Sequence, residues 1–276
     1  DSVISGDFEE IYKTSLIWML MIILCFVYDQ KVIVLIEAYA TPLQMSYEWG
    51  YGSEMASLVR SCFACLKEEK YLDRGIIMGT SDVCAPMTGR FQLSFSITDM
   101  LNMHVIRPTY NRYVSYFGFM EEEVLEALRE YNLEDKKEEV AFWYNGIRFG
   151  EVENIYNPYS IVHFLSNRRS GNYLSNDRMN RFFEMILDEE NDNYKLEDTM
   201  KQLVAGNTIR CEIEDEVVYA YLHRNQNAIL NYLMQNGYLK IINYDENDGN
   251  KYSWQLQYEL AVANNEMRAL LQEVFK

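Results

Sequence analysis

An acidic residue, Glu37, stands directly after an unbroken run of apolar residues, Val32–Ile36. Such a run is typical of a strand buried in a parallel sheet. A carboxylate at the end of that strand could hold Mg²⁺ and, through the metal, a nucleotide. The nearby positions that could add further acids carry Ala38 and Ala40, which have no acid chemistry. The pattern therefore indicates either a metal-binding strand that has lost its acids or a core strand that ends in glutamate.

The other residue types that could carry chemistry form no recognisable catalytic site. His104, His163 and His223 are far apart in the chain and have no acid or cysteine at ligand spacing, which favours surface or core positions. Cys62 and Cys65 form a CxxC without a second pair, inside a stretch that reads as a helix. We interpret these two cysteines as packing residues rather than as a redox or zinc motif.

The bulk composition excludes some classes of protein. A net charge of −17 over 276 residues argues against a protein that grips nucleic acid through a basic surface. Five cysteines, an odd and scattered set, argue against a disulfide framework and favour a reducing cytoplasm. We expect a cytoplasmic protein that does not bind nucleic acid directly.

One apolar run, Leu16–Tyr28, needs an interpretation of its own. It is shorter than the ~20 residues that a helix needs to span a bilayer, so we expect no membrane segment. A helix that is apolar on all sides is usually buried, and we expect a core helix here. The alternative is a contact surface for another chain, and if the helix is left exposed we expect self-association through it.

The first part of the chain, residues 1–110, has an α/β pattern. The run Lys31–Ile36 and the stretch Gly75–Gly79 read as strands, and Glu54–Lys70 between them reads as a helix. A helix between two buried strands predicts a β–helix–β unit in a parallel sheet. Asp73–Gly75 reads as the turn before the second strand.

Residues 111–206 read as an all-α region. Glu121–Tyr131 and Lys137–Tyr144 have helical patterns, and Asn145-Gly146 should stop the second helix. Asn157 and Pro158 should cap and begin a third helix. Residues 178–204 are expected to add more helix.

Residues 207–276 predict a small winged-helix-like α+β module. A helix over Asn227–Gln235 should end at Gly237, and strands over Tyr238–Asn243 and Tyr252–Leu260 should form a hairpin before a closing helix, Asn264–Phe275. A winged helix that reads DNA needs a basic recognition helix, and the first of these helices has no Lys or Arg. We interpret the module as a protein-contact or lid element.

Several motifs follow one another in a distinctive order. VIVLIEAYATPL is followed by GIIMGTSDV, YFGFMEEEV, WYNGIRFG, IYNPYSI and NAILNYLMQNGYL. This order resembles a bacterial family of AAA-type ATPases that often carry a restriction-endonuclease-like domain at the C-terminus. The resemblance implies a P-loop NTPase core with a parallel sheet, a helical lid and a winged-helix-like end.

The resemblance also shows what this chain departs from. The sequence contains no GxxxxGK[ST] motif, which in the family precedes the opening strand, and the nuclease-like domain of the family would follow Lys276. Family members usually have an acid pair and a later acid where this chain has Glu37, Ala38 and Ala40, which makes a degenerate Walker B strand. An Arg that family members commonly have after the next strand aligns with Asp82. Only Glu37 and Thr80 remain for nucleotide contact, and only Glu37 for a metal.

These departures lead to two principal hypotheses. The first is a non-hydrolytic, degenerate AAA-ATPase-like interaction or regulatory module, with no catalytic residue and no required cofactor. The alternative is a fragment of an active ATP-dependent protein whose P-loop and nuclease domain lie outside this chain, and in which Mg-ATP would bind. A third is a sequence that drifted from the family and folds without a selected function. In the first reading, the partner would be another protein or a second copy bound through Leu16–Tyr28.

Overall fold

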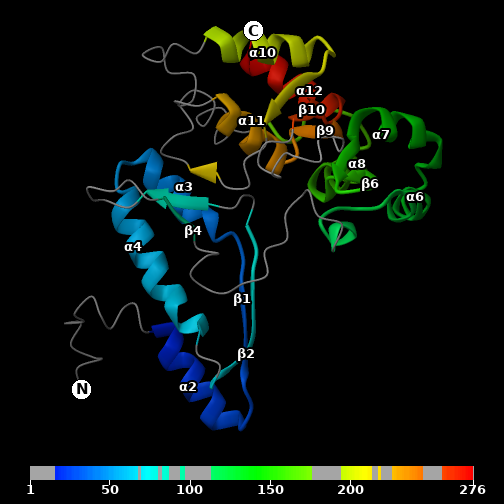
Figure 1. Cartoon of the computed structure of the whole chain (residues 1–276). Coiled ribbons are helices and arrows are strands. Elements are labelled where there is room, and N and C mark those ends of the chain that lie inside the picture. The colour runs from blue at the N-terminus through cyan, green and yellow to red at the C-terminus, as the bar shows by residue number, and fades with distance from the viewer. Residues whose placement is uncertain are drawn as a thin grey trace. The chain divides into compact units, whose positions relative to one another are not determined.

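A computed structural model of the chain shows a mixed α/β protein in two compact units (Figure 1). The first unit comprises Asp1–Val105 and Glu216–Ala220, and the second comprises Ile106–Asp215 and Tyr221–Lys276. The α/β class predicted from the sequence is confirmed at this level. The structure describes residues 16–67, 70–79, 83–86, 94–96, 113–175, 194–212, 217–218, 226–244 and 257–275.

The first unit contains the predicted parallel strand pair. β1 (Val32–Ile36) and β2 (Leu72–Ile77) run parallel and are hydrogen-bonded to each other. The chain between them forms α3 (Ala40–Glu48), α4 (Gly52–Phe63) and the short 3-10 helix η1 (Ala64–Lys67). The predicted β–helix–β unit is therefore confirmed, with α3 as an additional helix.

The predicted turn at Asp73–Gly75 is wrong, because these residues lie inside β2. Val32 is opposite Leu72 while Ile33 is opposite Arg74, so Asp73 is an extra residue in the strand. A bulge of this kind accommodates an extra residue without ending the strand. Polar residues and a glycine next to an apolar run therefore mark an irregular strand here rather than a turn.

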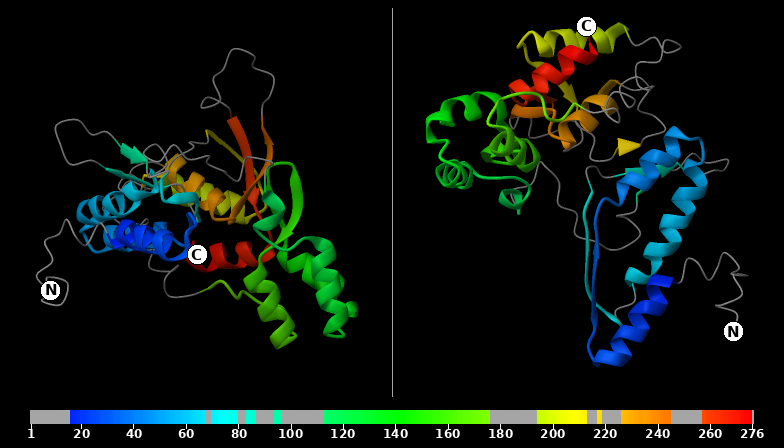
Figure 2. Two further views of the ribbon diagram at one scale, coloured as in Figure 1. Left: turned by 90° about the horizontal axis from the view of Figure 1, so that it is seen from below. Right: turned by 180° about the vertical axis from the view of Figure 1, so that it is seen from behind.

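The helix α2 (Leu16–Tyr28) forms as predicted, but its expected burial in the core is wrong. Met21 is 1% exposed, whereas Leu20, Ile23 and Phe26 are 55%, 54% and 78% exposed. α2 runs back alongside β1 and is apolar all round, so contact on one side leaves its other sides uncovered (Figures 1 and 2). None of the described helices has both the length and the apolar character that a bilayer crossing requires.

A second sheet in the first unit joins segments that are far apart in the chain. It has the strand order β4-β3-β8, with β3 (Val83–Pro86) antiparallel to β4 (Ser94–Ser96) and parallel to β8 (Val217–Val218). The sequence alone does not predict these three strands. β8 makes the first unit discontinuous, because its residues come after most of the second unit.

The second unit begins with the helices expected for the middle region. After the short 3-10 helix η2 (Val114–Tyr116) come α6 (Glu121–Glu130), the 3-10 helix η3 (Glu134–Lys136), α7 (Lys137–Tyr144) and α8 (Pro158–Asn167). The helices α6, α7 and α8 share one apolar core with the strand that directly precedes α8. The buried residues of this core are Val124, Leu128, Leu133, Val140, Tyr144, Tyr156, Ile161, Phe164 and Leu165.

The all-α character predicted for residues 111–206 is wrong. β5 (Asn145–Phe149) and β6 (Val152–Tyr156) form an antiparallel hairpin between α7 and α8. Asn145-Gly146 stops α7, as predicted, but the chain then continues directly as a strand. Gly150, with a φ of 56°, takes the left-handed conformation needed to turn between the strands.

The remainder of the second unit combines helices with a three-stranded antiparallel sheet of order β7-β10-β9. The predicted helix, hairpin and closing helix are confirmed as elements, and β7 is an additional strand. The winged-helix arrangement stays a prediction, and the turn at Asp245–Gly249 lies outside the described residues. The elements are α10 (Tyr194–Val204), β7 (Ile209–Glu212), α11 (Gln226–Gln235), β9 (Leu239–Tyr244), β10 (Gln257–Val262) and α12 (Asn265–Val274).

Capping residues set the helix ends as the sequence predicted. The Asn157 side chain accepts a hydrogen bond from the Tyr159 backbone N at 2.9 Å, with Pro158 in the first turn of α8. After α11, Gly237 has a φ of 78° and its backbone N donates to the Met234 carbonyl oxygen at 3.0 Å. This left-handed glycine is a common way for a helix to end.

Candidate functional site

The predicted nucleotide site lies at the carboxyl ends of β1 and β2, and among the described residues there Glu37 is the one acid. Glu37 directly follows β1 and is exposed, as is Ala38 beside it. Within the described residues Glu37 forms no ion pair, so it does not anchor the strand end through a neighbouring cation. An exposed carboxylate at this place could contact a metal ion or simply be solvated.

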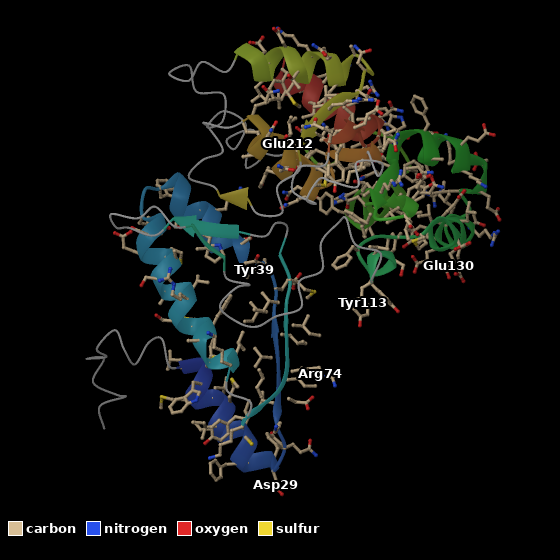
Figure 3. All side chains as sticks on the ribbon, viewed as in Figure 1. Asp29, Tyr39, Arg74, Tyr113, Glu130 and Glu212 are labelled. Carbon is tan, nitrogen blue, oxygen red and sulfur yellow. The ribbon has the colours of Figure 1, made fainter. Side chains whose placement is uncertain are left out.

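The two strand ends are held together by backbone and ring contacts. Met78 N donates to the Ile36 carbonyl oxygen at 2.8 Å, and Tyr39 N donates to the Met78 carbonyl oxygen at 3.3 Å. Gly79 lies against the Tyr39 ring, since a Cβ on Gly79 would come within 2.5 Å of Tyr39 Cε1. The structure therefore brings Glu37 and Gly79 to one end of the strand pair, where Figure 3 labels Tyr39. Thr80, the second expected contact residue, lies outside the described residues.

The two alanines at the predicted acid positions have different environments. Ala38 is exposed and has a φ of 53°, a left-handed conformation that Asn, Asp and Gly adopt more readily than alanine. Ala40 is the first residue of α3 and is 2% exposed, so its side chain belongs to the core. An acid at position 40 would be buried, whereas an acid at position 38 would be exposed beside Glu37.

The described residues do not make a metal site by themselves. Mg²⁺ takes six oxygen ligands, and proteins usually supply one or two carboxylates together with substrate phosphates. In the described part of the chain, no group of three His, Cys, Asp or Glu side chains is placed to hold a metal ion. Glu37 could thus act as a metal ligand only if phosphate groups and water completed the coordination.

The cysteine pair and His163 have the packing roles that the sequence indicated. Cys65 is buried and its Sγ donates to the Cys62 carbonyl oxygen at 3.1 Å, and neither cysteine forms a disulfide. Burial raises the pKa of Cys62, which disfavours the thiolate that redox chemistry would need. His163 lies between the rings of Tyr159 and Tyr173, at centroid distances of 4.3 and 5.5 Å.

A buried polar cluster in the second unit was not predicted from the sequence. Glu266, at the start of α12, is fully buried and accepts hydrogen bonds from Ser160 Oγ at 2.7 Å and Tyr173 N at 2.9 Å. Burial raises the pKa of Glu266, although the hydrogen bonds to its carboxylate lower it. The carboxylate joins α12 to α8 and to the segment that follows α8.

Tyr144 supplies a second part of the same junction. Its hydroxyl donates to the Gly171 carbonyl oxygen and accepts from the Gly171 N, both at 3.0 Å. Its carbonyl oxygen accepts a hydrogen bond from Asn264 Nδ2 at 3.1 Å, and Asn264 also caps α12 by accepting from Met267 N. The Glu266 carboxylate, the Tyr144 hydroxyl and the Asn264 amide are all hydrogen-bonded within the protein, although Asn172 Nδ2 next to them is buried without a partner among the described residues. We therefore interpret the cluster as a structural junction rather than as a binding site.

Two glycines of the quoted motifs have packing reasons. A Cβ on Gly118 would overlap the Ile155 side chain and the Tyr156 carbonyl oxygen, where Phe119 pairs with β6. Gly146 has a φ of 126°, and a Cβ there would overlap the Ala263 carbonyl oxygen just before α12. The YFGF and WYNG motifs thus mark close backbone approaches.

Comparison of the chain with protein-family models, with curated proteins and with solved structures gave no match in any of the three.

The residues of the second-unit junction could have been found from the sequence only by pairing segments about a hundred residues apart. Ser160 and Glu266, for example, are 106 positions apart. A buried glutamate in the first turn of an amphipathic helix looks like an ordinary solvent-exposed helix-dipole acid.

Proposed function

We propose that the chain is a non-hydrolytic, AAA-ATPase-like interaction or regulatory module. The observation that supports this most directly is Glu37, the one exposed acid among the described residues at the end of the parallel strand pair, with an alanine next to it. Phosphoryl transfer works almost wholly through positioned charges, and removing one such group typically costs about a hundredfold or more. One described acid at the strand ends, in a sequence without GxxxxGK[ST], favours contact over catalysis.

An alternative has an observation of its own: a fragment of an active ATP-dependent protein whose P-loop and nuclease domain lie outside this chain. Ile33 and Leu35 of β1 and Ile76 of β2 are on one face of the strand pair, since Leu35 is opposite Ile76, and all three are exposed. Parallel sheets in α/β proteins are usually covered on both faces. Further polypeptide that supplied strands and helices here would also supply the phosphate-binding loop.

The experiment that tests the proposal is calorimetric titration of the folded chain with Mg-ATP, together with an assay of phosphate release. Glu37→Ala is the test variant, and Glu130→Ala, an exposed acid on α6, is the matched control. We expect no phosphate release from any of the three. Binding that weakens in Glu37→Ala alone would make the module a nucleotide sensor, and no binding at all would leave protein contacts as its function.

Phosphate release that is abolished by Glu37→Ala and retained in Glu130→Ala would overturn the proposal. The assay must follow the activity through size-exclusion fractions, so that release by a contaminant does not count. The alternative predicts binding and hydrolysis only when an added polypeptide with a GxxxxGK[ST] motif is present.

A further inference from the structure

The outer surface of α2 carries an ordered row of exposed apolar side chains. Leu16, Leu20, Ile23 and Val27 follow one another at spacings of four, three and four residues, and each is more than half exposed. Alternating spacings of three and four residues keep side chains on one side of a helix and are the pattern by which two helices pack together. We call these four residues the α2 seam.

The size of this surface matches what a stable interface needs. Eight large apolar side chains of α2 are between 39% and 78% exposed. At about 3.6 residues per turn, six of them lie on the seam side of the helix: Leu16, Met19, Leu20, Ile23, Phe26 and Val27. With about 200 Å² for a large apolar side chain, these six present roughly 700 Å², which is close to one partner's share of a standard protein interface. The largest apolar patch on a typical monomer is smaller, about 300–600 Å².

The charge distribution allows a second copy as the occupant. The whole chain has a net charge of −17, but α2 contains no charged residue. Two copies can therefore meet along this helix without placing like charges face to face. Repulsion between the remainder of the two chains is screened beyond about 8 Å at physiological salt. Pairing through α2 should consequently strengthen as the salt concentration rises.

From these observations we propose that two copies of this chain pair through the α2 seam, with the two helices antiparallel about a two-fold axis. The antiparallel direction is favoured because it places the positive end of each helix dipole beside the negative end of the other. The axis then passes between Leu20 and Ile23, so Leu20 of one copy packs against Ile23 of the other. The proposal rests on the proposed interaction role and names a second copy as the partner.

Analytical ultracentrifugation over about 1–100 µM protein tests the pairing, since an interface of this size can be micromolar. We expect a reversible monomer–dimer equilibrium that shifts toward dimer with added salt. Leu20→Lys and Ile23→Glu should each give monomers, because each places a charge in the apolar interface. Phe142→Glu is the matched control, since Phe142 is 65% exposed on a helix of the second unit, and it should dimerise like the original chain.

Mixing the two charged variants tests the antiparallel direction. In an antiparallel pair, the Lys of one copy faces the Glu of the other, so the equimolar mixture should form a heterodimer that neither variant forms alone. Three results would overturn the pairing: an original chain that is monomeric over the whole concentration range, charged variants that both still dimerise, or an original chain that forms open-ended aggregates. A monomeric mixture overturns the antiparallel arrangement. Circular dichroism confirms that each variant is folded.

The phosphate-release assay and the ultracentrifugation can each overturn one proposal without affecting the other. Phosphate release that depends on Glu37 would overturn the non-hydrolytic role and leave the monomer–dimer equilibrium unaffected. A monomeric chain that also releases no phosphate would overturn the pairing and leave the non-hydrolytic role standing.

Discussion

At the residue scale, the side chain with the sharpest physical consequence is Glu266. It is buried, and the net effect of its surroundings is to raise its pKa in the folded chain. The folded state therefore binds more proton than the unfolded state at pH values between the ordinary glutamate pKa of about 4.3 and the raised pKa. Stability should fall as the pH rises from that value through the raised pKa, and should then stay level.

Substitution of Glu266 separates its charge from its hydrogen bonds. Glu266→Gln keeps an acceptor for Tyr173 N and a partner for Ser160, so we expect stability within about 1 kcal/mol of the original at neutral pH. The fall in stability with rising pH should be reduced in this variant. Glu266→Ala leaves buried polar groups without a partner and should cost roughly 2–4 kcal/mol. Guanidinium unfolding of the three proteins at several pH values measures all of these effects.

A second residue-scale prediction concerns Gly146. Any side chain there meets both an unfavourable φ of 126° and the Ala263 carbonyl oxygen, so Gly146→Ala should destabilise the chain by about 2–4 kcal/mol. Gly171→Ala is the matched control, because nothing lies within 4 Å of its added Cβ. Thermal unfolding of the two variants compares them, and equal stability would show that the backbone around Gly146 can move aside.

At the element scale, the strand pair of the first unit and the sheet of the second unit should differ in local stability. β1 and β2 form a two-stranded sheet whose outer face is exposed, and isolated two-stranded sheets are marginal in water. β10 is paired on both edges, and Leu260 within it is fully buried. On the exposed face of the β1–β2 pair, Figure 3 shows Arg74 on the side of β2 away from α2.

Amide hydrogen exchange measures that difference. We expect the amides of β10 to exchange at least about a hundredfold more slowly than those of β1, since exchange follows local opening. Conditions that favour the α2 dimer should slow exchange in α2 itself. Equal protection of β1 and β10 would mean that the first unit is as stable as the second, contrary to its open packing.

The elements that could be predicted are those with local signals. Asn157-Pro158 and Gly237 marked helix ends correctly because caps depend on neighbouring residues only. The exposure of α2 could not be predicted, since an apolar run shows what a helix could bury and not what is present to cover it. The β5–β6 hairpin was missed because Asn145-Gly146 fits both a helix stop and the start of a strand.

In the candidate site, too, the features with local sequence signals were predictable and those that depend on distant segments were not. The run Val32–Ile36 ending in Glu37 was predictable as a strand with a terminal acid, because the pattern is local. The burial of Ala40 and of Glu266 depends on which segments come together, and the same residue types are exposed in other helices. Thr80, also expected at the site, lies outside the described residues, so its predicted role stays a prediction.

At the scale of the whole molecule, the two units should unfold separately. Among the residues that the structure describes, most of the large, fully buried side chains, including Tyr144, Phe164 and Leu203, belong to the second unit, whereas Met21 represents the first. Since buried apolar area supplies most of the stability, the first unit should unfold at lower denaturant concentration. Trp18 and Trp49 belong to the first unit, and Trp143 and Trp254 belong to the second, so tryptophan fluorescence should show two transitions.

Excision of the second unit tests this separation. A fragment of residues 106–276 keeps the described core of α6, α7 and α8 and the sheet β7-β10-β9, and it separates β8 from its partner strand β3. We expect it to unfold cooperatively within about 1 kcal/mol of the second transition of the full chain, because this core and this sheet lie within the fragment. It should also be monomeric, since it lacks α2. An unfolded fragment would mean that the two units stabilise each other. In that case the full chain should unfold in a single transition rather than in two.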